Sequence, residues 1–106
     1  MLRRKAEPNR RVVKRLEKSL LREFGSQGVR HVEFVIAFSE PFTYWVWLGS
    51  ATDAEREQLQ ADASVNERIR AQAANLSIDA LYEGWTIESQ ETVDRDYQGS
   101  WFYRLR

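Results

Sequence analysis

The sequence predicts an α+β domain in the order αββαββ, with four strands in one largely antiparallel sheet and helices packed mainly on one face. Apolar residues recur at helical spacing before residue 25 and again within 53–76. Segments 30–48 and 85–106 are instead rich in β-branched and aromatic residues. Each half of the chain is thus a helical region followed by two strand-like segments, and consecutive hairpins favour a single sheet.

The first helix is predicted from about Pro8 to Phe24. Proline is tolerated in the first turn of a helix, and Gly25 is a natural stop. Residues 1–7 form a charged arm, and 8–106 form one domain, since 106 residues can bury a hydrophobic core. One face of the helix is apolar and the opposite face carries Arg11, Arg15, Lys18 and Arg22.

Two strands are expected next, "RHVEFVIAF" (30–38) and "TYWVWL" (43–48). The segment between them, "SEPF", contains Pro41, which cannot donate to a strand ladder, so it is predicted to be a hairpin turn. Gly49 ends the second strand.

The helical region 53–75 is expected to break or bend near Asp62 to Ser64. Thr52 and Glu55 have the spacing of a capping box, and Ser64 with Glu67 repeats that spacing inside the region. Two helix starts within one stretch favour two helices.

The C-terminal part is predicted to be a second hairpin, with strands "WTIESQETV" (85–93) and "SWFYRLR" (100–106) joined by "DRDYQG". Asp94, Asp96 and Gly99 match the first, third and sixth positions of a calcium loop. Gln98 and Leu105 hold the fifth and twelfth positions, where such a loop has an oxygen ligand and a bidentate glutamate. We therefore expect a turn and no metal site.

No motif in the sequence predicts catalysis or a cofactor. There is no cysteine, no glycine-rich phosphate loop and no nucleophile elbow. The single histidine, His31, is expected at a strand edge or on the surface. The glycines of Gly25-Ser-Gln-Gly28 have the spacing of an RNA-clamping loop, but a helix end followed by a tight return explains them better. We expect a non-enzymatic protein without a cofactor.

The zero net charge conceals a strong asymmetry. Residues 1–25 hold nine basic side chains against three acidic ones, whereas residues 40–96 hold twelve acids against four basic side chains. We expect these charges to pair within the molecule. The alternative is a nucleic-acid-binding module whose phosphate contacts come from the first helix, through Arg11, Lys14, Arg15, Lys18 and Arg22.

The aromatic strands are the most informative feature for function. Alternation places one apolar set under the helices, namely Val32, Phe34, Ile36, Phe38, Tyr44, Val46, Leu48, Trp85, Ile87, Trp101, Tyr103 and Leu105. Other apolar side chains must then lie on the second side of the sheet, where an antiparallel sheet with one helical layer is normally polar. A bulge in the second strand would reverse this assignment and bury the tryptophans.

The leading hypothesis is a small protein-interaction module that uses this second side of the sheet. Its contact area would come from Trp45, Trp47, Val35 and Phe102, with Glu33 and Arg104 as orienting charges at the rim. Self-association through the sheet would make it a homodimer. By analogy alone, small bacterial regulators and toxin-neutralising immunity proteins have this size and style. We expect a cytoplasmic location, because the sequence has no cysteine, no secretory signal and no membrane-spanning run.

Overall fold

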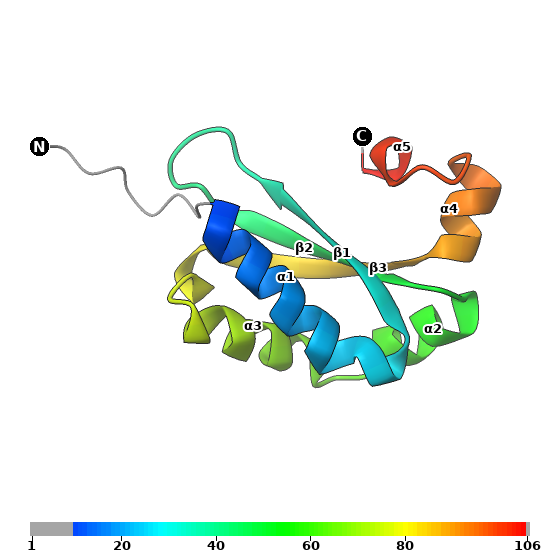
Figure 1. Cartoon of the computed structure of the whole chain (residues 1–106), viewed down its shortest axis with the longest axis horizontal. Coiled ribbons are helices and arrows are strands. Elements are labelled where there is room, and N and C mark those ends of the chain that lie inside the picture. The colour runs from blue at the N-terminus through cyan, green and yellow to red at the C-terminus, as the bar shows by residue number, and fades with distance from the viewer. Residues whose placement is uncertain (1–9, 106) are drawn as a thin grey trace, which may run out of the picture.

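The computed structural model of the chain describes residues 10–105, apart from the side chains of Phe102 and Tyr103, and shows an α+β fold (Figure 1). The expected arm 1–7 and the expected helix start at Pro8 lie outside the described residues. The elements in chain order are α1 (Arg10–Phe24), a 3₁₀ turn (Gly25–Gln27), β1 (Val29–Ile36), β2 (Tyr44–Ser50), α2 (Asp53–Ala61), α3 (Val65–Asn75), a second 3₁₀ turn (Asp79–Leu81), β3 (Tyr82–Ser89), α4 (Gln90–Asp96) and α5 (Trp101–Arg104).

The sheet has three strands in the order β1-β2-β3, so the prediction of four largely antiparallel strands is wrong. β1 and β2 form the predicted antiparallel hairpin, but β2 and β3 run parallel. The connection between them, residues 51–81, contains α2 and α3, and parallel neighbours need a long crossover of this kind. The sheet is therefore mixed.

The C-terminal hairpin is the second correction. β3 ends at Ser89, and the expected turn and fourth strand are the short helices α4 and α5. The Ser89 side chain accepts a hydrogen bond from the Thr92 backbone N–H at 3.1 Å, which caps α4 and ends the strand. Trp101 and Leu105 therefore do not belong to a strand that faces the core.

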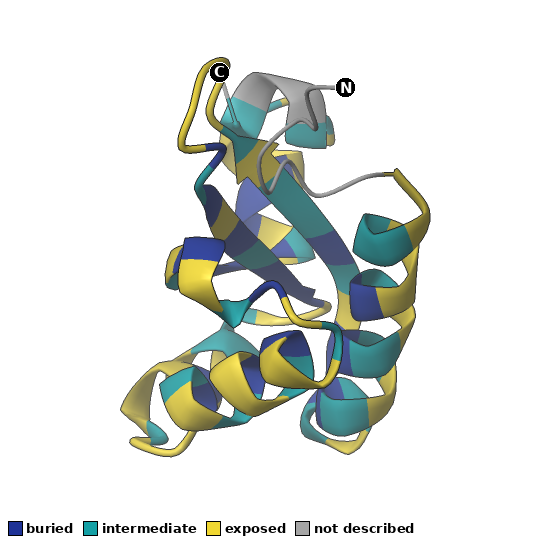
Figure 2. Ribbon diagram, turned by 90° about the vertical axis from the view of Figure 1, so that its left-hand side faces the viewer, coloured by how far each residue is buried: buried dark blue, intermediate teal, exposed yellow. Residues whose placement is uncertain are grey.

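Helices cover the two faces of the sheet unequally. α1, α2 and α3 lie on one side, which we call the inner face, while α4 and α5 lie on the other, the outer face, at the end where β3 finishes (Figure 1). In Figure 2 the helices direct their buried residues toward the sheet and their exposed residues outward. The core lies between the inner face and the helices, and its largest fully buried side chains are Phe24, Leu16, Leu20, Leu48, Leu59 and Ile69.

The predicted faces of the strands are confirmed for β1, for β2 and for Trp85 and Ile87 of β3. Val46 is buried on the inner face between Phe34 and Trp85 in the strand register. Trp45 and Trp47 belong to the opposite face, so the predicted alternative of inverted tryptophans is wrong. Phe38 is a further correction, because β1 ends at Ile36 and the Phe38 side chain is fully exposed in the hairpin loop.

The predicted break in the second helical region is confirmed, and one of its two capping boxes forms. The Thr52 hydroxyl accepts from the Glu55 N–H at 3.2 Å, while the Glu55 carboxylate accepts from the Thr52 N–H at 3.1 Å. Ser64 makes no such cap. Instead the Asp62 carboxylate accepts both the N–H and the hydroxyl of Ser64, at 2.9 and 2.7 Å, and so binds the start of α3 to the linker.

Gly25 to Gly28 form the predicted tight return after α1. Gly28 has φ +101°, and its N–H donates to the Gly25 carbonyl at 3.1 Å. A Cβ on Gly28 would lie 2.4 Å from the carboxyl carbon of Glu55. The turn therefore requires glycine both for its backbone angle and for its contact with the capping box of α2.

Candidate functional site

The outer face is partly covered by the C-terminal segment of the chain itself. The Trp101 indole lies against Gly49 of β2, where a Cβ would be 2.7 Å from the ring, and 4.6 Å from the imidazole of His31. Its Nε1–H donates to the Gln90 side-chain oxygen at 2.8 Å. These contacts hold α5 against the end of the sheet.

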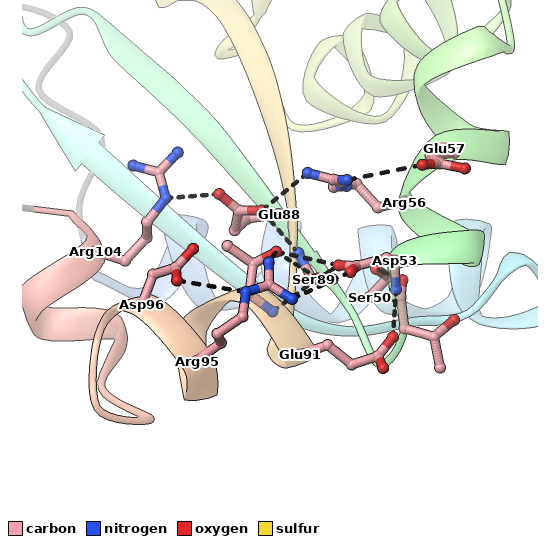
Figure 3. A network of polar contacts seen from close by, with 12 residues as sticks. Ser50, Asp53, Arg56, Glu57, Glu88, Ser89, Glu91, Arg95, Asp96 and Arg104 are labelled. Atoms are coloured by element: carbon pink, nitrogen blue, oxygen red, sulfur yellow. Dashed lines mark hydrogen bonds and ion pairs between the residues drawn. The ribbon is translucent and has the colours of Figure 1, made fainter.

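Arg104 is the second anchor of this segment. Its Nε–H donates to the Glu88 carboxylate at 2.8 Å, and its guanidinium lies 4.4 Å from the ring centre of Trp47. Glu88 is buried on β3 and also lies 3.5 Å from a guanidinium nitrogen of Arg56 on α2 (Figure 3). A buried carboxylate needs such partners, so the pair of arginines holds α2, β3 and α5 together.

A neighbouring set of hydroxyl and carboxyl groups connects α2 to α4. Both Ser89 and Thr92 donate their hydroxyl hydrogens to the Asp53 carboxylate, and Arg95 lies 3.6 Å from it (Figure 3). The Ser89 hydrogen bond is the main cause that lowers the pKa of Asp53 below its ordinary value. The cluster therefore connects the start of α2 to the start of α4.

An apolar patch remains exposed on the outer face beyond α5. We call it the outer patch, formed by Val35 and Trp45, which are 46% and 38% exposed; Phe38, in the loop between β1 and β2, is 102% exposed. Val35 and Trp45 face each other across β1 and β2. The Trp45 indole crosses Gly84 of β3, where a Cβ would lie 2.7 Å from the ring, and donates to the Thr86 hydroxyl at 2.7 Å. The ring is thus fixed flat on the sheet with one side exposed to solvent.

The edge of the sheet formed by β1, which no other described strand covers, adjoins this patch. β1 is an edge strand of eight residues without proline, and a groove of about 680 Å³ follows it. The groove is lined by residues of α1 and β1, namely Arg10, Val13, Lys14, Glu17, His31, Val32, Glu33, Phe34 and Ile36. Because side chains of both sheet faces line it, the groove follows the edge itself. We call it the edge groove.

His31 and Glu33 lie at this edge, as predicted for the histidine. The His31 Nε2 is 3.2 Å from a Glu33 carboxylate oxygen, which is an ion pair only when the imidazole is protonated. One face of the imidazole lies against Trp101, and its Nε2 makes no hydrogen bond within the described residues. Within residues 10–105 no group of three metal-ligating side chains gathers, around His31 or elsewhere.

Some of the predicted partner-binding residues remain exposed, and others contact the C-terminal segment of the chain. Val35 and Trp45 are exposed, and Glu33 lies in the edge groove. Trp47 and Arg104 contact each other, so the chain itself uses them. The side chain of Phe102 lies outside the described residues. Sequence reasoning missed Phe38, although its position next to the turn signal "SEP" could have identified it as a loop residue.

The predicted nucleic-acid-binding residues are all exposed on α1. Arg15, Lys18 and Arg22 line one groove of about 330 Å³ between α1 and α3, and Lys14 lines the edge groove on the other side of the helix. Arg11 lines neither groove among those described. The basic face is therefore divided between two surfaces.

Comparisons with protein-family models, curated proteins and solved structures give no match for this chain. Among residues 10–105, no helix has the length and apolar character needed to cross a membrane.

Proposed function

We propose that this chain is a non-enzymatic protein-interaction module that accepts an extended segment of a partner protein along the free edge of β1. The observation that carries the proposal is the combination of an edge strand that pairs on one side only within residues 10–105 with apolar side chains exposed on both of its faces. Phe34 and Ile36 are accessible in the edge groove, and Val35 with Trp45 is accessible on the outer face.

An edge strand directs the backbone N–H and C=O groups of alternate residues away from its neighbour, and an added strand satisfies them. Side chains of that added strand would alternate between the two faces. One set would enter the edge groove beside Val13, Phe34 and Ile36, and the other set would lie beside Val35. This is the arrangement of recognition by β-strand addition, in which the backbone supplies affinity and the pockets supply specificity.

The size of the outer patch favours a transient partner over a permanent dimer. Even with the fully exposed Phe38 of the neighbouring loop included, the partly exposed Trp45 and Val35 offer only on the order of 300–400 Å² of apolar surface. A stable interface buries about 800 Å² on each partner. We therefore infer that the chain alone is a monomer. Backbone pairing along β1 supplies the affinity for the partner that the outer patch does not. The homodimer expected from the sequence becomes an outcome to be tested.

The test uses random ten-residue peptides selected for binding to the immobilised chain, followed by titration of the selected free peptides. We expect peptides with apolar residues at alternate positions, and protection of β1 backbone amides from hydrogen exchange in the complex. Ile36→Lys should weaken binding at least tenfold, because it places a charge in the edge groove. Glu83→Lys is the matched control, since it adds a lysine at the exposed opposite edge on β3 and should leave binding unchanged.

Two results would contradict the proposal. One is protection of β3 amides in place of β1 amides, together with loss of binding in Glu83→Lys. The other is a peptide-free dimer in light scattering that persists at high salt and dissociates on Trp45→Ala, because a symmetric dimer would then occupy this face.

A further inference from the structure

Most of the basic side chains that form no ion pair within residues 10–105 lie on α1. Four arginines after residue 53 form ion pairs with carboxylates of the chain: Arg56, Arg68, Arg95 and Arg104. Between residues 10 and 105 no ion pair involves Arg10, Arg11, Lys14, Arg15, Lys18 or Arg22. The expectation that the basic N-terminal part pairs with the acidic remainder is therefore wrong for this helix.

The one ion pair that joins α1 to α3 has the opposite polarity to the expected one. Glu23 of α1 accepts from Arg68 of α3 at 2.8 Å, and the Glu23 carboxylate also accepts from Gln72 at 3.2 Å. Glu23 is thus used for packing α1 against α3, while the basic residues of α1 remain exposed. No acid in the first turn of α1 compensates the cations that the helix dipole disfavours there.

The groove between α1 and α3 gathers part of this unpaired charge. Arg15, Lys18 and Arg22 form one wall, Gln72 and Asn75 the other, and no carboxylate lines it. Ser19 on the floor donates to the Gln72 side-chain oxygen, which fixes the amide in place. We call this the basic groove. Concave surfaces with charge of one sign concentrate oppositely charged ligands.

We propose that the basic groove and the adjoining Arg11 bind the phosphate backbone of double-stranded nucleic acid without sequence preference. Every polar residue type in the groove is one that contacts phosphates in protein–nucleic-acid complexes: arginine, lysine, serine, glutamine and asparagine. Arg11, Arg15, Lys18 and Arg22 form a row along roughly 16 Å of helix, at about 1.5 Å per residue. A row of that length suits a continuous line of phosphates better than a single anion.

The same lining argues against two other ligands. An acidic protein would need apolar anchors for a specific interface, and Leu76 is the groove's only apolar side chain. Single-stranded nucleic acid is held largely by stacking on aromatic rings, and none lines this groove. Contacts to the phosphates alone are therefore the mode that these residues provide, and the binding is independent of the strand-addition function.

The experiment titrates the full chain into a fluorescein-labelled 15-base-pair DNA duplex and follows fluorescence anisotropy as a function of salt. Four phosphate contacts predict a log–log slope of about −3.6, which is roughly 150-fold weaker binding at 200 mM than at 50 mM salt. A duplex of scrambled sequence should bind equally well. The dissociation constant should lie in the non-specific range, about 10⁻⁴ to 10⁻⁶ M.

The double variant Arg15→Glu, Arg22→Glu should weaken binding at 50 mM salt at least tenfold and reduce the slope to about −1.8. Arg70→Glu is the matched control, because Arg70 is an exposed helical arginine on α3 without an ion pair among the described residues, and it should bind like wild type. Equal circular-dichroism melting curves would show that the double variant is folded. A salt-independent titration, equal weakening by Arg70→Glu, tighter binding to single-stranded DNA, or equally tight binding to polyglutamate would each overturn the proposal.

Discussion

The covering of the outer face by the C-terminal segment can be tested at Arg104. Arg104→Ala removes the 2.8 Å charged hydrogen bond to Glu88 and the stacking on Trp47. A hydrogen bond to a charged group contributes about 1.5–3 kcal/mol, and a cation over an indole about 0.5–1 kcal/mol. Glu88 keeps Arg56 and the Ser89 backbone N–H, so the larger penalty of an orphaned buried charge does not apply.

We therefore expect Arg104→Ala to lower the free energy of unfolding by about 2–3 kcal/mol. For a domain of this size the melting temperature should fall by about 10–20 °C. The measurement is urea and thermal unfolding followed by circular dichroism. A double-mutant cycle with Glu88→Gln should give a coupling energy above about 1 kcal/mol, since the two side chains touch.

Arg95→Ala is the matched control for this prediction. Arg95 also pairs with acids, Asp53 and Asp96, but its side chain is 61% exposed, so its loss should cost less than about 1 kcal/mol. If Arg104→Ala and Arg95→Ala had the same small effect, Arg104 would not hold α5 on the sheet. Trp47 would then be free to contact a partner, as the sequence alone suggested.

Two further predictions concern the turn after α1 and the cluster at the start of α4. Gly28→Ala should lower the free energy of unfolding in urea by about 2–3 kcal/mol, because Gly28 has a positive φ and a Cβ there would clash with Glu55. Gly25→Ala should be nearly neutral, because a Cβ there meets nothing within 4 Å. Equal effects of the two substitutions would contradict this reasoning. Because the pKa of Asp53 is lowered in the folded chain, the carboxylate contributes fully to stability above its ordinary pKa of 3.8, and this contribution is lost as the pH falls below that value. The urea midpoint of Asp53→Asn should therefore fall less between pH 5 and pH 2 than the midpoint of wild type. Parallel pH curves for the two proteins would refute this prediction.

Local patterns were sufficient to predict most of the first half of the fold. The apolar spacing of α1, the strand pattern of the β1–β2 hairpin and the capping box at Thr52 each depend on residues close in sequence. The face assignment of Trp45 and Trp47 followed from alternation alone. Phe38 was misplaced because alternation was extended past Ile36, where β1 ends.

The direction of β3 was predictable but was missed. Two helices between β2 and β3 form a crossover long enough for parallel pairing, and that signal should have outweighed the preference for hairpins. The C-terminal segment differs, because "SWFYRLR" has the composition of a strand. Its conformation is set by distant contacts, Trp101 against Gly49 and Arg104 with Glu88, and strand propensity yields to such contacts.

The exposed surfaces follow from how the chain uses its charges and its aromatic rings. On the outer face, Arg104 pairs with Glu88 and covers the ring of Trp47. Trp45 has no such neighbour among the described residues and stays exposed, and α1 has cations without acids opposite them. Net neutrality therefore arises because an acidic remainder balances the basic N-terminal part in number, although the cations of α1 form no ion pair with those acids among the described residues. α1 separates the edge groove from the basic groove, so a strand added along β1 would lie beside Arg10 and Lys14. Such a bound strand would leave the row of basic residues from Arg11 to Arg22 accessible.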